Sequence, residues 1–294
     1  MNSNQFKGTG VALITPFRKD KSIDFRALEN LVNFQIENGT NFLVVLGTTS
    51  EAATLTKDEQ NAVINFIIEI NDKRLPIVVG CGSNNTTELV QNVKELNKPG
   101  IDGILSAAPY YNKPNQTGIY EHFKALAEAT PLPIILYNVP GRTASNIAAE
   151  TTIKLAKKFK NIVAIKEASG NFEQMMQIVK NKPKNFLVFS GDDATTLPLI
   201  SLGFDGVISV LANAYPADFS KMVQLALDNN FTEARTIHYK LIDIINSMFA
   251  DGNPAGVKAY LNLQKRIENN LRLPLVPVND KLFAEIIKLE KEYS

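Results

Sequence analysis

Short, uninterrupted apolar runs recur along this chain, and they constrain its fold more than any other feature. Continuous hydrophobicity indicates strands that are covered on both faces, as in a parallel sheet beneath helices, whereas the strands of an antiparallel sandwich would alternate apolar and polar residues. We therefore expect eight buried parallel strands. The runs lie at residues 10–14, 41–46, 77–79, 103–105, 134–137, 162–165, 186–189 and 206–210.

Between these runs lie segments with helical periodicity and polar starts. Thr56 and Glu59 have the spacing of a capping box ahead of the apolar segment 62–67. The strand–helix unit recurs about every 25 to 35 residues, which is the size of one βα step, and eight such steps close a barrel. The sequence predicts an α/β fold in which residues 1–229 form a (β/α)₈ TIM barrel.

Only helical patterns follow residue 229, at 231–250, 254–269 and 279–293, with breaks at Gly252-Asn253-Pro254 and at 274–277. They predict a helical C-terminal domain over residues 230–294. The competing fold is an open doubly wound sheet, which would carry a glycine-rich phosphate-binding turn after its first strand. Thr15-Pro16-Phe17 is not such a turn, so we favour the barrel.

The charge balance argues against several kinds of partner. The 31 basic and 30 acidic residues leave a net charge of +1, without the basic stripe that a nucleic acid needs. No window approaches the ~20 apolar residues of a membrane span, and the polar first residues do not resemble a secretory signal. The single cysteine, Cys81, cannot form an internal disulfide. We expect a cytoplasmic protein that binds neither nucleic acid nor membrane.

In a barrel of this kind, reactive groups gather at the carboxyl ends of the strands. Polar residues that close an apolar run are therefore the candidates for chemistry. They are Thr48, Thr49, Glu51, Tyr110, Tyr111, Tyr137, Arg142, Lys166, Glu167, Asp192 and Asp193.

Lys166 is the most informative of these candidates because it lies within an apolar strand. An ammonium there is costly unless it loses its proton or finds a partner. Strand alternation puts Lys166 on one face with Ala164 and Ala168, which leaves room for a long side chain in the barrel interior. A neutral amine there would attack a ketone to form a Schiff base, as in class I aldolases. The alternative is a structural ion pair with Glu167 or another acid at the barrel rim.

Tyr137 ends a buried strand, and Arg142 follows it beyond a tight turn. A phenol beside an iminium ion can act as general acid and base, and a guanidinium suits a substrate carboxylate. The alternative for Tyr137 is a hydroxyl that is hydrogen-bonded in the core.

Two other kinds of site are disfavoured. The histidines, His122 and His238, lie in expected outer helices, where we expect them to face solvent or an interface, so no metal site is predicted and no cofactor is expected. Asp192 and Asp193 stand where barrel enzymes bind phosphate groups, which argues against a phosphorylated substrate.

Taken together, these motifs resemble those of the dihydrodipicolinate synthase family, in the pyruvate-dependent class I aldolase superfamily, over essentially the whole chain. Their order and spacing carry the resemblance. They are Gly47-Thr48-Thr49-Ser50-Glu51, Pro109-Tyr110-Tyr111-Asn112-Lys113-Pro114, Tyr137-Asn138-Val139-Pro140-Gly141-Arg142-Thr143, Ile165-Lys166-Glu167-Ala168-Ser169-Gly170 and Ser190-Gly191-Asp192-Asp193. Ser50 departs from the glycine of many members, which concerns only the local shape of the loop.

The resemblance implies a function, namely condensation of pyruvate with L-aspartate 4-semialdehyde on the path to diaminopimelate and lysine. It implies that Lys166 forms the Schiff base, that Tyr137 moves its protons, and that Thr48 and Tyr111 complete a relay, with Tyr111 reaching into a neighbouring subunit. It also implies a homotetramer built as a dimer of dimers. Substrate contacts are implied for Thr49, Arg142, Gly191 and the backbone of Ile208.

The resemblance further implies an inhibitory lysine site formed by Ala52, Ala53, Asn84, Glu88 and Tyr110. Gln60 stands where responsive members often have histidine or glutamate, so sensitivity to lysine stays open. Two other functions also stay open. One is a related lyase such as N-acetylneuraminate lyase, which shares the lysine and tyrosine but lacks an arginine at the place of Arg142. The other is a non-catalytic barrel that serves as a scaffold or ligand sensor.

Overall fold

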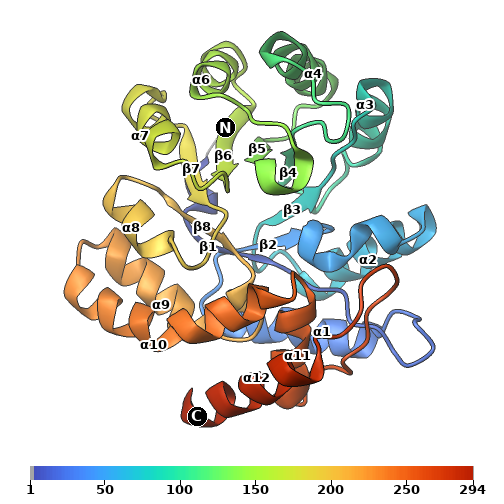
Figure 1. Cartoon of the computed structure of the whole chain (residues 1–294). Coiled ribbons are helices and arrows are strands. Elements are labelled where there is room, and N and C mark those ends of the chain that lie inside the picture. The colour runs from blue at the N-terminus through green and yellow to red at the C-terminus, as the bar shows by residue number, and fades with distance from the viewer. Residues whose placement is uncertain (1–2, 294) are drawn as a thin grey trace.

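The computed structural model describes residues 3–293, which form a closed barrel of eight parallel strands surrounded by helices (Figure 1). Each strand pairs with its neighbours in chain order, and β8 returns to β1 with Gly10 opposite Ile208. The strands are β1 (Gly8–Ala12), β2 (Phe42–Val45), β3 (Ile77–Gly80), β4 (Gly103–Ala107), β5 (Ile134–Asn138), β6 (Ile162–Glu167), β7 (Leu187–Ser190) and β8 (Gly206–Ser209). The eight expected strands are confirmed, although β1 begins two residues earlier than the apolar run.

One or more helices follow each strand. The helix after β2 begins with the capping box expected from sequence, in which Thr56 and Glu59 exchange side-chain and backbone hydrogen bonds. The helices of the barrel are α1 (Phe25–Glu37), α2 (Lys57–Asn71), α3 (Thr86–Glu95), α4 (Gln116–Ala129), α5 (Pro140–Thr143), α6 (Ala149–Lys158), α7 (Phe172–Asn181), α8 (Thr196–Ser201) and α9 (Pro216–Leu227), with 3₁₀ turns η1 (Ser3–Phe6), η2 (Thr48–Ser50), η3 (Ala52–Thr54) and η4 (Leu211–Asn213).

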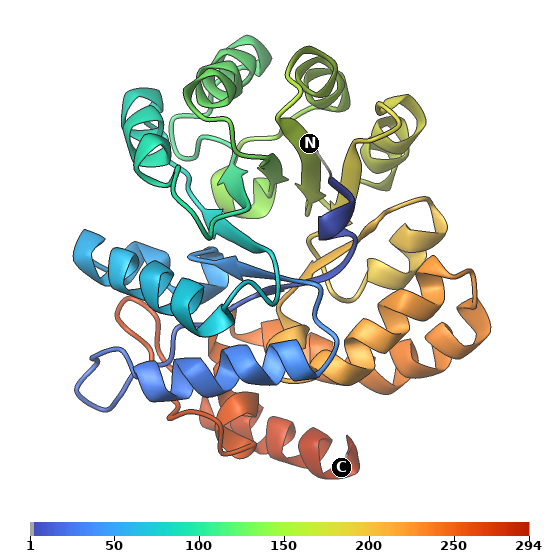
Figure 2. The ribbon, with the colours of Figure 1, turned by 180° about the vertical axis from the view of Figure 1, so that it is seen from behind.

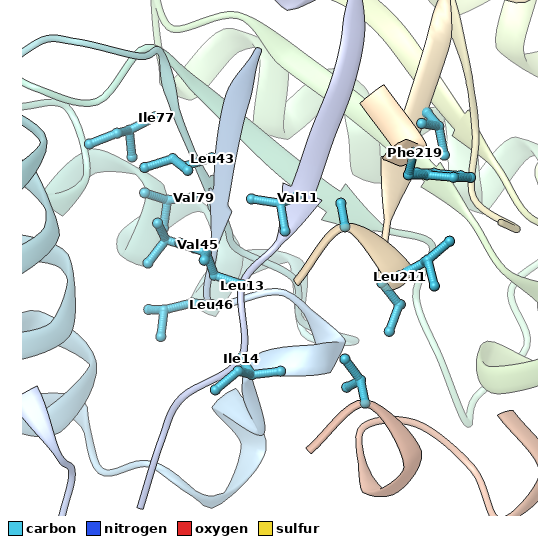
Figure 3. Close-up of a cluster of buried hydrophobic side chains, with 14 of the residues drawn as sticks. Val11, Leu13, Ile14, Leu43, Val45, Leu46, Ile77, Val79, Leu211 and Phe219 are labelled. Atoms are coloured by element: carbon cyan, nitrogen blue, oxygen red, sulfur yellow. The ribbon is translucent and has the colours of Figure 1, made fainter. Parts of the chain in front are cut away.

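Two apolar layers hold the barrel together. The outer layer lies between strands and helices, and it includes Val11, Leu43 and Val79 from the strands and Leu211 and Phe219 from η4 and α9 (Figure 3). The inner layer fills the barrel, and burial of each large side chain in it stabilises the fold by roughly 1.5–3 kcal/mol. The inner residues include Phe6, Phe42, Leu105, Ile135, Ala164, Phe189 and Ile208.

The amino-terminal end of the barrel is closed by η1, which crosses the mouth of the strands (Figure 2). Phe6 is fully buried and packs edge-on against Phe42, with ring centroids 5.7 Å apart. The cavity of the molecule therefore opens at the other end, at the carboxyl ends of the strands.

Three further helices follow the barrel, α10 (Phe231–Ala250), α11 (Ala255–Leu263) and α12 (Asp280–Tyr293). The first matches its expected range, whereas α11 ends six residues earlier than the pattern 254–269. In Figure 1, α10 lies beside α9, while α11 and α12 lie outside the ring of barrel helices. Hydrogen bonds from Tyr215 to Glu290 and from Tyr293 to Asp218 fasten α12 to the rest of the chain.

The prediction that the two histidines face solvent or an interface is wrong, since both are buried in the helical layer. His122 lies on the inner face of α4 with Ile119 and Leu126, and its Nδ1 is 2.8 Å from the hydroxyl of Thr86 on α3. His238 is buried in α10. Both residues lie on the apolar face of their helices. The prediction considered only that histidine is polar and did not consider its position in the helical repeat.

Candidate active site

A cavity of about 400 Å³ opens at the carboxyl ends of the strands, where barrel enzymes carry their chemistry. It collects six of the eight catalytic and substrate-binding candidates named from sequence, Thr48, Thr49, Tyr137, Arg142, Lys166 and Gly191. Its remaining lining residues are Ala12, Val44, Gly47, Leu105, Val139, Gly141, Ala168, Asp192, Val210, Phe249 and Asn253.

Lys166 projects from β6 into this cavity. Ala168, two residues further, lines the same cavity, and Ala164, two residues earlier, packs in the inner core, as strand alternation requires. The side chain of Lys166 is almost fully buried, at 5% exposure. Small neighbours on its face of the strand leave the space that its long side chain occupies.

Glu167, the next residue, points to the opposite face of β6. Its carboxylate accepts hydrogen bonds from the amide of Asn138, the amide of Gln174 and the backbone N–H of Ser169. These donors account for the buried charge of Glu167. No carboxylate lies within 4.0 Å of the Lys166 amine in the described part of the chain, so the alternative of a structural ion pair is wrong.

Tyr137 on β5 lies beside Lys166. The two residues are register partners in adjacent strands, and the Lys166 amine lies 4.4 Å from the centre of the Tyr137 ring. Gly191, after β7, makes this arrangement possible. A Cβ atom there would lie 2.6 Å from Ala168 Cβ and 3.0 Å from Lys166 Cε, so a side chain at 191 would displace the lysine.

Thr48 and Thr49 reach the cavity on the turn η2, directly after β2. Thr49 is buried, whereas Thr48 is exposed. Glu51 ends the turn in the left-handed conformation, with φ 58°, and its side chain is fully buried. Glu51 accepts hydrogen bonds from Lys258 at 2.5 Å and from the backbone N–H of Arg272 at 2.9 Å, so the C-terminal region fixes the turn that carries both threonines.

Arg142 lies in α5, the short helix that follows β5, with its side chain at the mouth of the cavity. The following residue, Thr143, is buried, and its hydroxyl donates to the backbone carbonyl of Val139 or Ser145. Arg142 is therefore an exposed cationic side chain on a well-anchored turn, which suits the capture of an anionic group.

Tyr111 is not brought to the cavity of its own chain. It is 87% exposed with φ 72°, and its backbone N–H donates to the carbonyl of Thr143. Asn84 lies next to Tyr110 and donates to its carbonyl at 3.3 Å. The side chains of Ala52 and Ala53 lie on η3, where Gln60 donates to the carbonyl of Ala52.

The end of β8 is organised by Asp193. Its carboxylate is buried and accepts hydrogen bonds from the backbone N–H groups of Val210 and Leu211. Burial is the largest influence on this group and raises the pKa of Asp193 to about 6. Ile208 itself is buried in the inner core and is not a lining residue, whereas Val210 is.

Two lining residues that the sequence did not predict lie beyond the barrel, Phe249 at the end of α10 and Asn253 in the turn before α11. The sequence Gly252-Asn253-Pro254 is typical of a break between helices. The only feature that could have indicated a cavity residue there is the amide side chain of Asn253 between two turn-forming residues. The amide of Asn253 donates to the hydroxyl of Thr49 at 2.9 Å. The wall of the cavity therefore includes a segment far beyond the barrel in sequence.

The cavity thus offers an amine, a phenol, two hydroxyls and a guanidinium, a set that suits a small carbonyl compound with a carboxylate. Comparison with known proteins agrees with this chemistry. Residues 5–292 match the dihydrodipicolinate synthetase family. Among proteins named 4-hydroxy-tetrahydrodipicolinate synthase, that of Phocaeicola vulgatus is 56% identical (97% of this chain, 96% of the relative) and that of Parabacteroides distasonis is 53% identical (98% and 97%).

Solved structures give the same result. The crystal structure of dihydrodipicolinate synthase from Aquifex aeolicus has a TM-score of 0.95 at 41% identity and covers 98% of both chains. The corresponding structure from Thermotoga maritima has a TM-score of 0.96 at 41% identity and covers 98% of this chain and 99% of that one. These relationships extend over barrel and C-terminal helices alike, and this chain belongs to the dihydrodipicolinate synthetase family.

Proposed function

We propose that this chain is a Schiff-base-forming lyase that condenses pyruvate with L-aspartate 4-semialdehyde, the activity of a 4-hydroxy-tetrahydrodipicolinate synthase. The observation that carries the proposal is the buried Lys166 amine, which lies in the cavity beside Tyr137 with no carboxylate within 4.0 Å among residues 3–293. Family membership and the names of the relatives support the same activity.

The chemistry begins when the nitrogen lone pair of the Lys166 amine attacks the ketone carbon of pyruvate and water leaves to give an iminium ion. Loss of a methyl proton converts this ion into an enamine, whose carbon attacks the aldehyde of the second substrate. The amino group of that substrate then attacks the iminium carbon, which closes the ring and releases Lys166. One water is lost overall, and the protons begin and end on groups of the cavity.

Tyr137 is the group that we propose for proton transfer at the carbinolamine and enamine steps, because its ring lies against the Lys166 amine. Thr48 and Tyr111 would continue the relay to solvent. We propose that Thr49, Gly191 and the Ile208 backbone surround pyruvate. Arg142 is our candidate for the carboxylate of the aldehyde substrate, since a guanidinium can bind it through two hydrogen bonds.

Assembly is part of this proposal. Tyr111 is exposed and outside its own cavity, which is the position expected of a residue that serves a neighbouring subunit. We propose a homotetramer, a dimer of dimers, that works in the cytoplasm. None of the described helices is long and apolar enough to cross a membrane. An inhibitory lysine site at Ala52, Ala53, Asn84, Glu88 and Tyr110 is also a proposal.

Borohydride reduction in the presence of pyruvate tests the proposal. We expect one reduced pyruvate unit per chain on the peptide that contains Lys166, and no adduct with Lys166→Ala. Lys184→Ala, which changes an exposed lysine, is the control and should trap pyruvate as the unmodified chain does. An adduct at another lysine would contradict the assignment, and absence of any adduct would favour a scaffold or sensor.

The choice of aldehyde is tested by assays with L-aspartate 4-semialdehyde and with N-acetylneuraminate in the cleavage direction. We expect turnover only with the first. Arg142→Ala should raise the KM for the aldehyde without abolishing the pyruvate adduct, because the Schiff base forms before the aldehyde binds. An unchanged KM would remove this role from Arg142.

A further inference from the structure

The turn before α11 enters the cavity from outside the barrel. Asn253 is buried at 9% exposure and lines the cavity together with Phe249. Its amide nitrogen donates to Thr49 Oγ1 at 2.9 Å, a contact between residues 204 positions apart. Its amide oxygen is buried without a hydrogen-bond partner among the described residues. The bond to Thr49 is therefore the interaction that orients this amide.

The hydroxyl of Thr49 has one acceptor lone pair occupied by this bond. A hydroxyl has a single proton, which rotates to meet an available acceptor, and Thr49 makes no other side-chain hydrogen bond within residues 3–293. Because the Asn253 amide nitrogen is the donor in this bond and accepts no hydrogen bond, the Thr49 proton is not used in it. It is free to donate into the cavity that Thr49 lines.

The backbone of the same turn is held by a separate set of contacts. Glu51, two residues beyond Thr49, is bonded to the Lys258 amine and to the backbone N–H of Arg272. The Asn253 amide is therefore not needed to keep the turn in place. Its loss should release the rotation of one hydroxyl rather than displace the loop, which separates a positioning role from a structural one.

We propose that Asn253 is a positioning residue, which turns the Thr49 hydroxyl proton toward the carboxylate of the bound keto acid. The inference rests on the proposed function, because it needs a carboxylate substrate in the cavity. It assigns the helical C-terminal region a role in substrate binding in addition to its role in packing. Asn253 acts through Thr49, so its effect should vanish when Thr49 has no hydroxyl.

The test compares pyruvate concentrations that give half-maximal borohydride trapping. Asn253→Ala should raise this concentration about tenfold, as expected for loss of one oriented hydrogen bond to a charged group, with the maximal adduct per chain unchanged. Thr49→Val should raise it at least as far, and the double variant should be no weaker than Thr49→Val alone. Asn246→Ala, at an exposed position on α10, is the matched control and should match the unmodified chain.

Asn253→Asp provides a second test, because aspartate has the same side-chain shape as asparagine. It lacks the N–H donor, so we expect weaker trapping that again depends on Thr49. Binding like that of the unmodified chain would mean that Thr49 donates to residue 253 and would overturn the proposal, as would additive effects in the double variant. Absence of trapping in the unmodified chain would instead refute the proposed function.

Discussion

Disruption of the buried ion pair Glu51–Lys258 tests most directly how the C-terminal helices support the active-site turn. Both side chains have 0% exposure and their charged atoms are 2.5 Å apart. Burial lowers the pKa of Lys258 to about 8, and the neighbouring Glu51 carboxylate acts in the opposite direction and favours the charged amine. Its ammonium also donates to the carbonyl of Asn270 and lies 4.3 Å from the centre of the Phe17 ring.

Lys258→Met keeps most of the side-chain volume but removes the charge. Glu51 would then be buried with the backbone N–H of Arg272 as its remaining hydrogen-bond donor among the described residues. Breaking one side of a buried pair costs about 3–5 kcal/mol. A loss near the middle of that range would raise the unfolding equilibrium constant roughly 10³-fold, since ~1.4 kcal/mol is a factor of ten.

The assay is denaturant unfolding at pH 7 and a fixed protein concentration, followed by circular dichroism. The double variant Glu51→Gln, Lys258→Met should recover much of the lost stability, because it leaves no uncompensated buried charge. A loss below about 1 kcal/mol in Lys258→Met, or a double variant as unstable as the sum of the single variants, would refute the view that this pair anchors the turn.

Three further predictions concern other parts of the molecule. Gly191→Ala should reduce borohydride trapping of pyruvate at Lys166 at least tenfold, because the added Cβ would meet the lysine side chain. Gly141→Ala is the control and should trap pyruvate normally, because a Cβ there meets nothing within 4 Å. Equal trapping by the two variants would contradict the steric argument. Burial lowers the pKa of His122 from 6.5 to about 4. Between these values the unfolded chain binds a proton that the folded chain does not, so stability should fall by up to ~3 kcal/mol as the pH falls through this window. In denaturant unfolding, the free energy of unfolding of His122→Gln should depend less on pH than that of the unmodified chain. The same dependence on pH in both proteins would exclude His122 as its source. Tyr111→Phe should lower kcat while the adduct still forms, and unchanged steady-state turnover would remove this residue from the relay.

The sequence by itself determined the layers of this protein. Continuous apolar runs indicated buried parallel strands, and their alternation with helical segments indicated the barrel, because both patterns depend on neighbours along the chain. Strand alternation placed Lys166 inside the barrel, on one face with Ala164 and Ala168, and its position at the carboxyl end of a strand indicated the chemistry. The division between residues 229 and 230 stays a prediction.

Only the tertiary structure decided which distant segments complete the cavity. Asn253 meets Thr49 across 204 residues, and Lys258 meets Glu51 across 207. A turn motif such as Gly252-Asn253-Pro254 encodes a local bend, but its position above the barrel depends on how α10 and α11 pack. The reason is physical: backbone periodicity is a local property, whereas the pairing of buried polar groups depends on the packing of the whole chain.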